Sequence, residues 1–474
     1  MRRDRAFDSR IGLVAAALTL SAAAVWAAGP SVPPGVAILF SGLAVAVLSF
    51  GALSRPALAL AAVAVVLVAG NTDGPLGVPL ARILALGAVA VVLTARLGGQ
   101  GRRIGRSPVL LAMAVLVAAA LLSTLSSVDL GRSLRQDVGY VTGLLLASAI
   151  VMATGRRSDL LLVAVALCVG GGVLCGTSLV PFPDLRVETS DAALVTNRPV
   201  GVFAQPNELG LCAAMTVCLS VALIVVAHRL RRPWMTGLCV AAAVPSLVAL
   251  AVSLSRGAWI GTMVGLVLLA ALLREARPLL LCLGTVVMLT LGLFATAPSF
   301  TSQPVVVQRL TSVFGGPGNP YDERPSARAE AIVQMSENPV LGSGPGAFRT
   351  ATYQGAAHVA AARQEEHAHN LFLAVGAEQG VLGGAALVVA IGTGAAAALA
   401  NRGRPEAPAD LTSRGVSAAA AASLAAVIGH GLVDYPLRNP VIGIMAWFFI
   451  GLLAASARSR PPATGRTRLR EAEA

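Results

Sequence analysis

The sequence predicts an all-α membrane protein that crosses the bilayer about 14 times. Hydrophobic residues make up 56% of the 474 residues, and charged residues only 12%. Soluble domains carry about 25% charged residues, so this composition excludes a soluble globular chain. The third observation is a series of apolar segments, most of which reach the roughly 17–25 residues that a spanning helix needs.

The apolar segments follow one another along the chain with one long interruption. Candidate spans lie at residues 11–28, 36–53, 56–71, 78–95, 108–125, 138–154, 159–181, 208–227, 234–254, 257–273, 278–296, 370–399, 415–433 and 438–457. The first is interpreted as a retained helix rather than a cleaved signal peptide. We divide the chain into N-terminal helices with an outer loop (1–207), central helices (208–296), a long extracytoplasmic loop (297–369), C-terminal helices (370–457) and a cytoplasmic tail (458–474).

The positions of the arginines predict the orientation in the membrane. All 36 basic residues are arginine, and 24 of them lie at the N-terminus, in every second connection and in the tail. The positive-inside rule therefore predicts that both termini are cytoplasmic. The other 12 arginines lie elsewhere. Those on the predicted outer side, Arg198 and Arg256 among them, oppose this signal and invite a functional reason. Because the arginines are scattered between apolar segments, the net charge of +13 does not indicate nucleic-acid binding.

The stretch "RQEEHAHNLFLAVGAEQG" (363–380) brings the two closest histidines to the edge of an apolar helix. Three roles are open: a metal site, a catalytic base, or a solvated loop end. Glu365, Glu366, His367 and His369 are plausible ligands, but their spacing fits no strong zinc signature. An imidazole that titrates near neutrality suits a general base, and His369 is the favoured candidate.

Other polar residues at the outer side have structural or secondary interpretations. Glu378 is a candidate for orienting the site or for neutralising an arginine. His430 and Asp434 are four residues apart, which predicts a structural hydrogen-bonded pair on one helix face. In the long loop, "YDERPSARAEAIVQMSENP" (321–339) predicts a surface helix with Ala329, Ile332, Val333 and Ser336 along one face, followed by the glycine-rich turn "LGSGPGAF".

Four separated stretches resemble the O-antigen ligase and O-antigen polymerase superfamily of membrane glycosyltransferases. These are "NRPVGVFAQPNELG", "LSRGAWIG", "ENPVLGSGPGAF" and "HAHNLFLAVGAEQGVLGG". Their order, spacing and common outer side make the combination specific, and "DYPLRNPVIGIMAWFFIGLL" is similar to the family's last helix pair. The resemblance covers about residues 196–457, whereas the first seven spans specify nothing beyond hydrophobicity.

The resemblance implies a fold similar to that of GT-C membrane glycosyltransferases and a reaction without a metal ion or other cofactor. The implied donor is a glycan on undecaprenyl diphosphate, and the acceptor is a saccharide, a lipid or a wall component at the outer face of the cytoplasmic membrane. The family's diphosphate-binding arginines correspond to Arg198 and Arg256, its loop arginine to Arg328, and its catalytic histidine to His369. Secondary candidates for the site are Asn207, Asn370, Glu378 and His367.

The chemistry of the residues is compatible with this implied reaction. Arginine binds phosphate oxygens bidentately and stays charged at any working pH. Direct attack on the anomeric carbon from the side opposite the diphosphate would invert its configuration.

Two other classes of function stay open at this point. A flippase or secondary transporter of lipid-linked glycans would show an internal repeat or paired broken helices, and a non-catalytic subunit of an export complex would not need His369 beside outer arginines. Only a glycosyltransferase predicts that Arg198, Arg256 and His369 converge on one outward-facing cavity.

Overall fold

The structure of the protein is a computed structural model that describes residues 55–67, 79–99, 105–180, 186–187, 195–285, 324–355, 366–402 and 408–457. Within these residues the chain is a bundle of helices with one two-stranded antiparallel ribbon, β1 (Arg186–Val187) and β2 (Val195–Thr196). The predicted all-α membrane fold is confirmed. The spans expected at 11–28 and 36–53, and the part of the 278–296 span after residue 285, lie outside the described residues.

Eight described helices are long and apolar enough to cross a membrane. They are α4 (Leu80–Leu97), α6 (Leu130–Ala153), α7 (Arg157–Thr177), α8 (Pro206–Arg229), α9 (Pro233–Val252), α15 (Leu371–Arg402), α16 (Pro408–Gly431) and α17 (Pro440–Ala457). Three shorter apolar helices, α3 (Ala57–Val66), α5 (Pro108–Thr124) and α10 (Arg256–Leu272), correspond to further predicted spans. Helix α6 begins eight residues before the predicted 138 because Asp129 caps it and its first two turns are polar.

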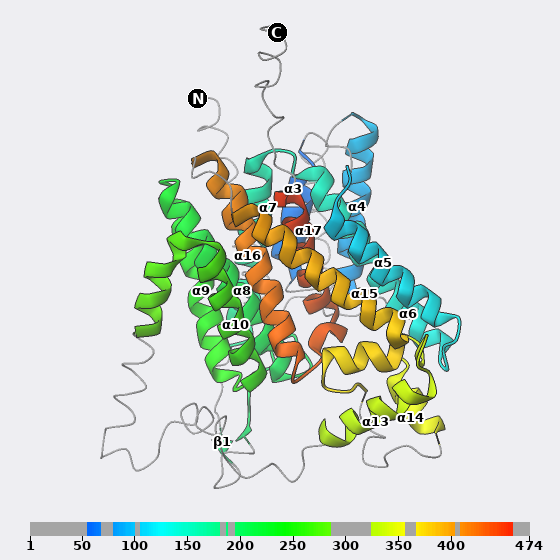
Figure 1. The fold of residues 1–474 in the computed structure, drawn as a ribbon. Coiled ribbons are helices and arrows are strands. Elements are labelled where there is room, and N and C mark those ends of the chain that lie inside the picture. Colours follow the sequence, from blue (N-terminus) through cyan, green and yellow to red (C-terminus); the bar gives the residue numbers. More distant parts are fainter. Residues whose placement is uncertain are drawn as a thin grey trace, which may run out of the picture.

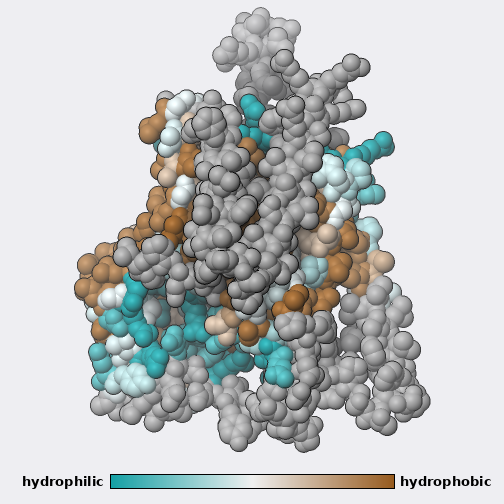
Figure 2. Space-filling model, turned by 180° about the vertical axis from the view of Figure 1, so that it is seen from behind, coloured by the Kyte–Doolittle hydropathy of each residue, from teal (hydrophilic) through white to brown (hydrophobic). Residues whose placement is uncertain are grey.

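The two ends of the bundle differ in what they carry. Figure 1 shows α13 (Arg324–Glu337), α14 (Phe348–Gln354) and β1 at one end, and the last turns of α17 at the other. Two short 3-10 helices, η4 (Arg274–Ala276) and η6 (Pro436–Arg438), complete the described elements. In Figure 2 a band of hydrophobic side chains lies between hydrophilic residues at both ends, as expected for a protein that faces lipid around its middle.

Small residues bring α10 unusually close to α16. A Cβ added to Gly261 would lie 2.4 Å from the carbonyl oxygen of Ala426, and one added to Gly265 would lie 2.6 Å from that of Ala422. Glycine at helix contacts lets backbones approach closely in membranes. The first turn of α10 is thereby held against the last turn of α16.

Helix α15 is broken at Gly380, whose backbone angles (φ 62°, ψ −162°) are not helical. The glycine-rich segment 339–344 enters this break and takes the place of the missing helical hydrogen bonds. The amide of Gly344 donates to the carbonyl of Glu378 at 2.9 Å, and the amide of Val381 donates to the carbonyl of Pro339 at 2.8 Å. Two of the stretches that carry the family resemblance are therefore structural partners.

The helix predicted in the long loop exists, but its buried face differs from the face that the apolar pattern suggests. The residues of α13 that are buried are Ala327, Glu330, Ala331 and Gln334. Ala329 and Ile332 are exposed instead. Hydrogen bonds explain this difference. The Nε2 of Gln334 donates to the Glu330 carboxylate, to the Phe348 carbonyl and to the Thr352 hydroxyl. Helix α14 therefore covers the polar side of α13.

Candidate active site

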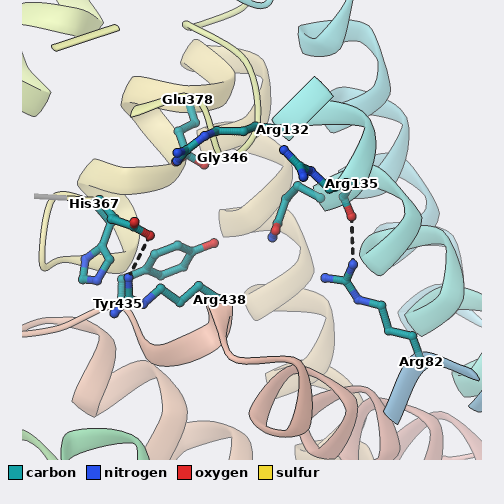
Figure 3. Close-up of a pocket in the computed structure, with 10 residues that line it drawn as sticks. Arg82, Arg132, Arg135, Gly346, His367, Glu378, Tyr435 and Arg438 are labelled. Carbon is teal, nitrogen blue, oxygen red and sulfur yellow. Dashed lines mark hydrogen bonds and ion pairs between the residues drawn. The ribbon is translucent and has the colours of Figure 1, made fainter. Parts of the chain in front are cut away.

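A cavity of about 340 Å³ opens between the start of α6, the first part of α15 and the segment after α16. We call it the arginine cavity, and its lining residues are Arg82, Arg132, Arg135, Gln136, Gly346, Glu366, His367, Glu378, Tyr435 and Arg438. Figure 3 shows Arg82, Arg132 and Arg135 on one side, facing His367, Tyr435 and Arg438 on the other. Four arginines against two glutamates give the cavity an excess of positive charge, which suits an anionic ligand.

Hydrogen bonds and ion pairs hold the arginines of the cavity in place. Arg82 Nη1 donates to the backbone carbonyl of Arg135 at 2.9 Å. Arg438 Nη1 lies 3.3 Å from a carboxylate oxygen of Glu366, which also pairs with Arg349 at 3.3 Å. Sequence reasoning did not single out the four cavity arginines. The signal was nevertheless present, because all four belong to the 12 arginines that lie outside the predicted cytoplasmic segments.

An apolar cavity of about 390 Å³ lies beside the arginine cavity. Its walls come from α5, α6, α10, α15, α16 and α17, and include Leu268, Leu387 and Trp447. The two cavities share Gln136 and Tyr435. A ligand with a hydrophobic chain and an anionic head group would fit the chain in the apolar cavity and the head group in the arginine cavity.

Glu378 is a buried residue in the wall of the arginine cavity. It lies just before the break in α15, and the backbone amides of Gly346 and Phe348 interact with its carboxylate. Of the two roles expected for Glu378, orienting the site agrees better with these contacts, because the residue holds the glycine-rich turn against the cavity.

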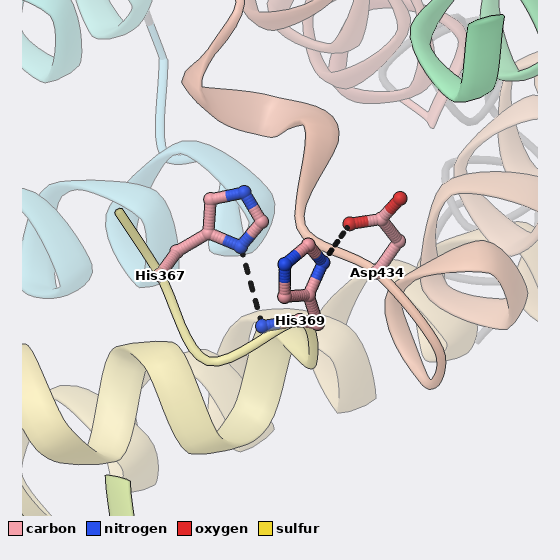
Figure 4. A group of neighbouring side chains, drawn as sticks. All are labelled: His367, His369 and Asp434. Carbon is pink, nitrogen blue, oxygen red and sulfur yellow. Dashed lines mark hydrogen bonds and ion pairs between the residues drawn. The ribbon is translucent and has the colours of Figure 1, made fainter. Parts of the chain in front are cut away.

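His369 and Asp434 form a buried pair between the start of α15 and the end of α16. His369 Nδ1 lies 3.0 Å from Asp434 Oδ1, although 65 residues separate them (Figure 4). His369 has the positive φ of 48° that L-residues rarely adopt. Asn370 fixes this turn: its Oδ1 accepts the amides of Phe372 and Leu373 as a helix cap, and its Nδ2 donates to the Leu432 carbonyl at 2.8 Å.

The charge on Asp434 defines the protonation of this pair. Burial raises the pKa of the Asp434 carboxyl, but the facing rings of His369 and His430 more than offset this, and the net pKa lies below the ordinary value. An ionised carboxylate accepts a hydrogen bond from Nδ1–H of His369, so the neutral ring carries its lone pair on Nε2. This is the arrangement in which a carboxylate orients a histidine as general base.

The predicted hydrogen bond between His430 and Asp434 does not form. Nε2 of His430 lies 3.9 Å from Asp434 Oδ2, beyond hydrogen-bond distance. The backbone amide of Asp434 still donates to the His430 carbonyl at 3.1 Å, but the Asp434 side chain is directed toward His369. His430 therefore acts on Asp434 through its electrostatic field.

A chain of hydrogen bonds connects Arg198 to His369. Asn207 Nδ2 donates to Asp434 Oδ2 at 2.7 Å, and Asn207 Oδ1 accepts from Arg198 Nη2 at 3.2 Å. Arg198 Nε donates to the Ser253 carbonyl at 2.8 Å. Asn207, at the start of α8, thus joins the predicted arginine to the carboxylate that orients His369.

The other two predicted arginines differ in their relation to this group. Arg256 begins α10, and a Cβ on the next residue, Gly257, would touch Val433 and His430. The start of α10 is therefore packed beside the Asp434 segment. Arg328 lies on α13, its buried Nε has no hydrogen-bond partner in the described structure, and no described contact joins it to His369.

His367 has a different hydrogen-bonding role from His369. Its Nδ1 accepts the backbone amide of His369 at 3.2 Å, and its ring lies against that of His369 with centroids 4.3 Å apart. His367, His369 and Asp434 offer ligand atoms within 4.8 Å of one another, a set that a metal ion such as zinc accepts. Both Nδ1 atoms are engaged in hydrogen bonds, and each ring still offers its Nε2, so the same arrangement suits either an oriented base or a metal ligand.

The fold and site define an all-helical, multi-pass membrane protein with a histidine–aspartate pair between arginine groups. Residues 241–388 match the family model described as O-antigen ligase. This segment is similar to the O-antigen ligase family and includes three of the four stretches on which the predicted resemblance rests, so the resemblance is confirmed there. The match contains Arg256, Arg328 and His369 but ends before Asp434. No curated protein matches the chain. The family indicates activity of the O-antigen ligase or polymerase type, with a lipid-linked glycan and an acceptor used at the membrane.

Proposed function

We propose that the protein transfers a glycan from undecaprenyl diphosphate to an acceptor hydroxyl at the outer face of the cytoplasmic membrane. The observation that carries this proposal is the oriented His369–Asp434 pair, because transport or scaffolding does not require a base held by a carboxylate. His367 lies against His369 and also lines the arginine cavity, so base and positive charge are neighbours.

The two cavities support a lipid diphosphate as the donor. The apolar cavity suits the start of a prenyl chain, and the arginine cavity suits the diphosphate. Arg198 and Arg256, the arginines that the family resemblance assigns to the diphosphate, lie on the Asp434 side of His369. Arginines on both sides can neutralise the charge that develops on the leaving diphosphate, the task that a divalent cation performs in many glycosyltransferases. We therefore propose a metal-independent reaction.

The proposed chemical step is a single displacement. Nε2 of His369 removes the proton from the acceptor hydroxyl while the oxygen attacks the anomeric carbon, and the bond from that carbon to the diphosphate oxygen breaks. Asp434 stabilises the imidazolium that forms. The products are the inverted glycoside and undecaprenyl diphosphate, which leaves with the electron pair of the broken bond.

The decisive experiment is product identification. The purified protein in nanodiscs is incubated with lipid-linked glycan and candidate saccharide, lipid and wall acceptors, and the products are identified by mass. A new glycosidic bond with inverted configuration is expected. Movement of the lipid-linked glycan between leaflets without a new bond would favour a flippase and contradict the proposal.

Asp434→Asn is expected to lower the transfer rate by roughly 10²–10⁴-fold, because His369 loses the carboxylate that orients it and stabilises its protonated form. The negative charge of Asp434 favours the imidazolium, so its removal should also move the acidic limb of the pH–rate profile toward lower pH. The measurement is transfer rate against pH for both proteins. A uniform loss at every pH with an unmoved limb would restrict Asp434 to a structural role.

The orientation predicts opposite labelling at the two ends of the bundle. Cysteine at Leu97, which is 91% exposed at the end of α4, should react with impermeant reagents only from the cytoplasmic side. Cysteine at Gln354 on α14 should react from the outside. Cys282, the one exposed native cysteine, is first replaced by serine. Labelling of both positions from the same side would remove the proposed site from the outer face.

A further inference from the structure

Helix α13 is amphipathic, but its polar side faces the protein and its apolar side faces outward. A helix on a water-exposed protein surface has the opposite arrangement. Glu330 and Gln334 are 0% and 1% exposed, whereas Ile332 is 59% and Met335 36% exposed. The buried Gln334 makes three hydrogen bonds, to Glu330 at 2.7 Å, to the Phe348 carbonyl at 3.1 Å and to Thr352 at 3.0 Å. The polar side of α13 is thus satisfied by protein, and the apolar side is left outward.

The outward residues form one stripe at helical spacing. Pro325, Ala329, Ile332 and Met335 follow one another at intervals of four, three and three residues, and all are exposed. A helix in contact with water turns its apolar stripe inward and its charged face outward. The reversed pattern therefore indicates an apolar environment on the outer side of α13.

The stripe is continuous with the lipid-facing surface of α15. Met335 lies over Gly376 of α15, where an added Cβ would come within 2.9 Å of the Met335 sulfur. The carbonyl of Val340, a residue that is 56% exposed, accepts the amide of Leu382 at 3.5 Å. Val381 and Leu382, which are 61% and 42% exposed, begin the part of α15 that follows the break at Gly380.

Exposed apolar residues then continue along α15 toward the opposite end of the bundle. Val388, Val389 and Leu399 are each more than half exposed. In the most apolar 18-residue stretch of α15, only 17% is buried inside the protein. Most of the surface of this helix is therefore available for contact with lipid. The exposed apolar surface of α15 therefore continues across Val340 to the stripe on α13.

We propose that α13 lies in the outer membrane–water interface, with Ala329 and Ile332 turned toward the acyl chains and Met335 packed between this stripe and α15. Its partner is the lipid of the bilayer itself. Interfacial helices bury their apolar face by about 5–10 Å at the boundary between head groups and acyl chains. Arg324, in the first turn of α13, has a side chain long enough to reach the head groups.

This placement has a consequence for the neighbouring cavity. Gln334 ties α13 to α14, and the glycine-rich turn between these two helices carries Gly346 in the wall of the arginine cavity. A helix anchored at the lipid surface would hold this wall at the depth where head groups lie. The inference itself rests on exposure and continuity, and does not depend on the proposed glycan transfer.

The test measures the depth of single side chains in the full-length protein. Cysteine is placed at Ile332 or, as a matched control, at Gln354, the polar exposed end of α14, in a chain whose Cys282 is replaced by serine. Both variants are labelled with an environment-sensitive fluorophore and placed in nanodiscs that hold one copy each. We expect the label at 332 to emit at shorter wavelength, to be quenched by lipids brominated near the carbonyl end of the chains, and to resist iodide.

The control label at 354 should show the opposite behaviour, with strong iodide quenching and little effect of brominated lipids. Equal iodide quenching at both positions would place α13 in water and overturn the proposal. A label at 332 that is shielded from both quenchers would also overturn it, because protein rather than lipid would then cover the stripe. If shielding at 332 appeared only when two copies share a disc, the partner would be a second chain and the lipid assignment would be wrong.

Discussion

His369→Ala is expected to abolish glycan transfer while the protein still inserts and folds. Loss of a general base costs about 10²–10⁴-fold in rate, and His369 is the residue that the Asp434 carboxylate orients at 3.0 Å. His367→Ala should cause a milder loss, since His367 contacts the His369 backbone and the wall of the arginine cavity but is not paired with Asp434. The measurement is the rate of product formation by each purified variant.

Chelation separates the base from a metal ligand. A metal-bound histidine also fails at low pH, because ligation needs the neutral ring, so the pH profile alone does not distinguish the two roles. We expect full activity after exhaustive treatment with EDTA. If His367, His369 and Asp434 held a metal, activity would fall with EDTA and return with added zinc, and alanine at 367 would be as damaging as alanine at 369. That pair of results would reverse the assignment of His369.

Gly380→Ala is expected to destabilise the outer half of the protein and to reduce the yield of folded, active chain. The backbone angles of Gly380 (φ 62°, ψ −162°) lie in a region that is essentially restricted to glycine, where another residue costs about 1–3 kcal/mol. A Cβ at this position would also lie 2.3 Å from the carbonyl oxygen of Val340, a backbone atom that cannot rotate away. Thermal unfolding of the purified protein should therefore begin at a lower temperature.

Gly384→Ala is the matched control in the same helix. Among the described residues, no atom outside the adjacent helix backbone lies within 4 Å of a Cβ added to Gly384, so alanine there should be neutral or slightly stabilising. In soluble helices alanine is favoured over glycine by about 1 kcal/mol. If Gly380→Ala were as stable as Gly384→Ala, the docking of segment 339–344 into the break of α15 would not contribute to stability.

The sequence by itself determined the fold class, the positions of the described spans and the resemblance to the superfamily. These features depend on local composition and on the length of apolar runs, which a linear pattern contains in full. The side assigned to the arginines also follows from the linear pattern and stays a prediction. His369 was singled out in the same way, through residue type and a motif that a single segment carries.

Only the tertiary structure decided which residues surround His369. Asp434 looked like a partner of His430 because both lie near one helix end, but the turn after α16 directs its carboxylate to His369. Arg82, Arg132, Arg135 and Arg438 come from segments that the chain brings together only when α4, α6 and η6 pack at the outer end of the bundle. Contacts between distant segments produce no periodic pattern and no fixed residue spacing that could be recognised in the sequence.

The same limit explains the reversed face of α13. Its 3.6-residue period correctly predicted a helix with one apolar side, but a period does not tell whether that side meets protein or lipid. Here Gln334 and Glu330 form a hydrogen-bonded contact with α14, so the polar side is inward and Ile332 is outward. Local sequence fixes which side of a helix is apolar, whereas the neighbours that satisfy its polar groups decide which way that side points.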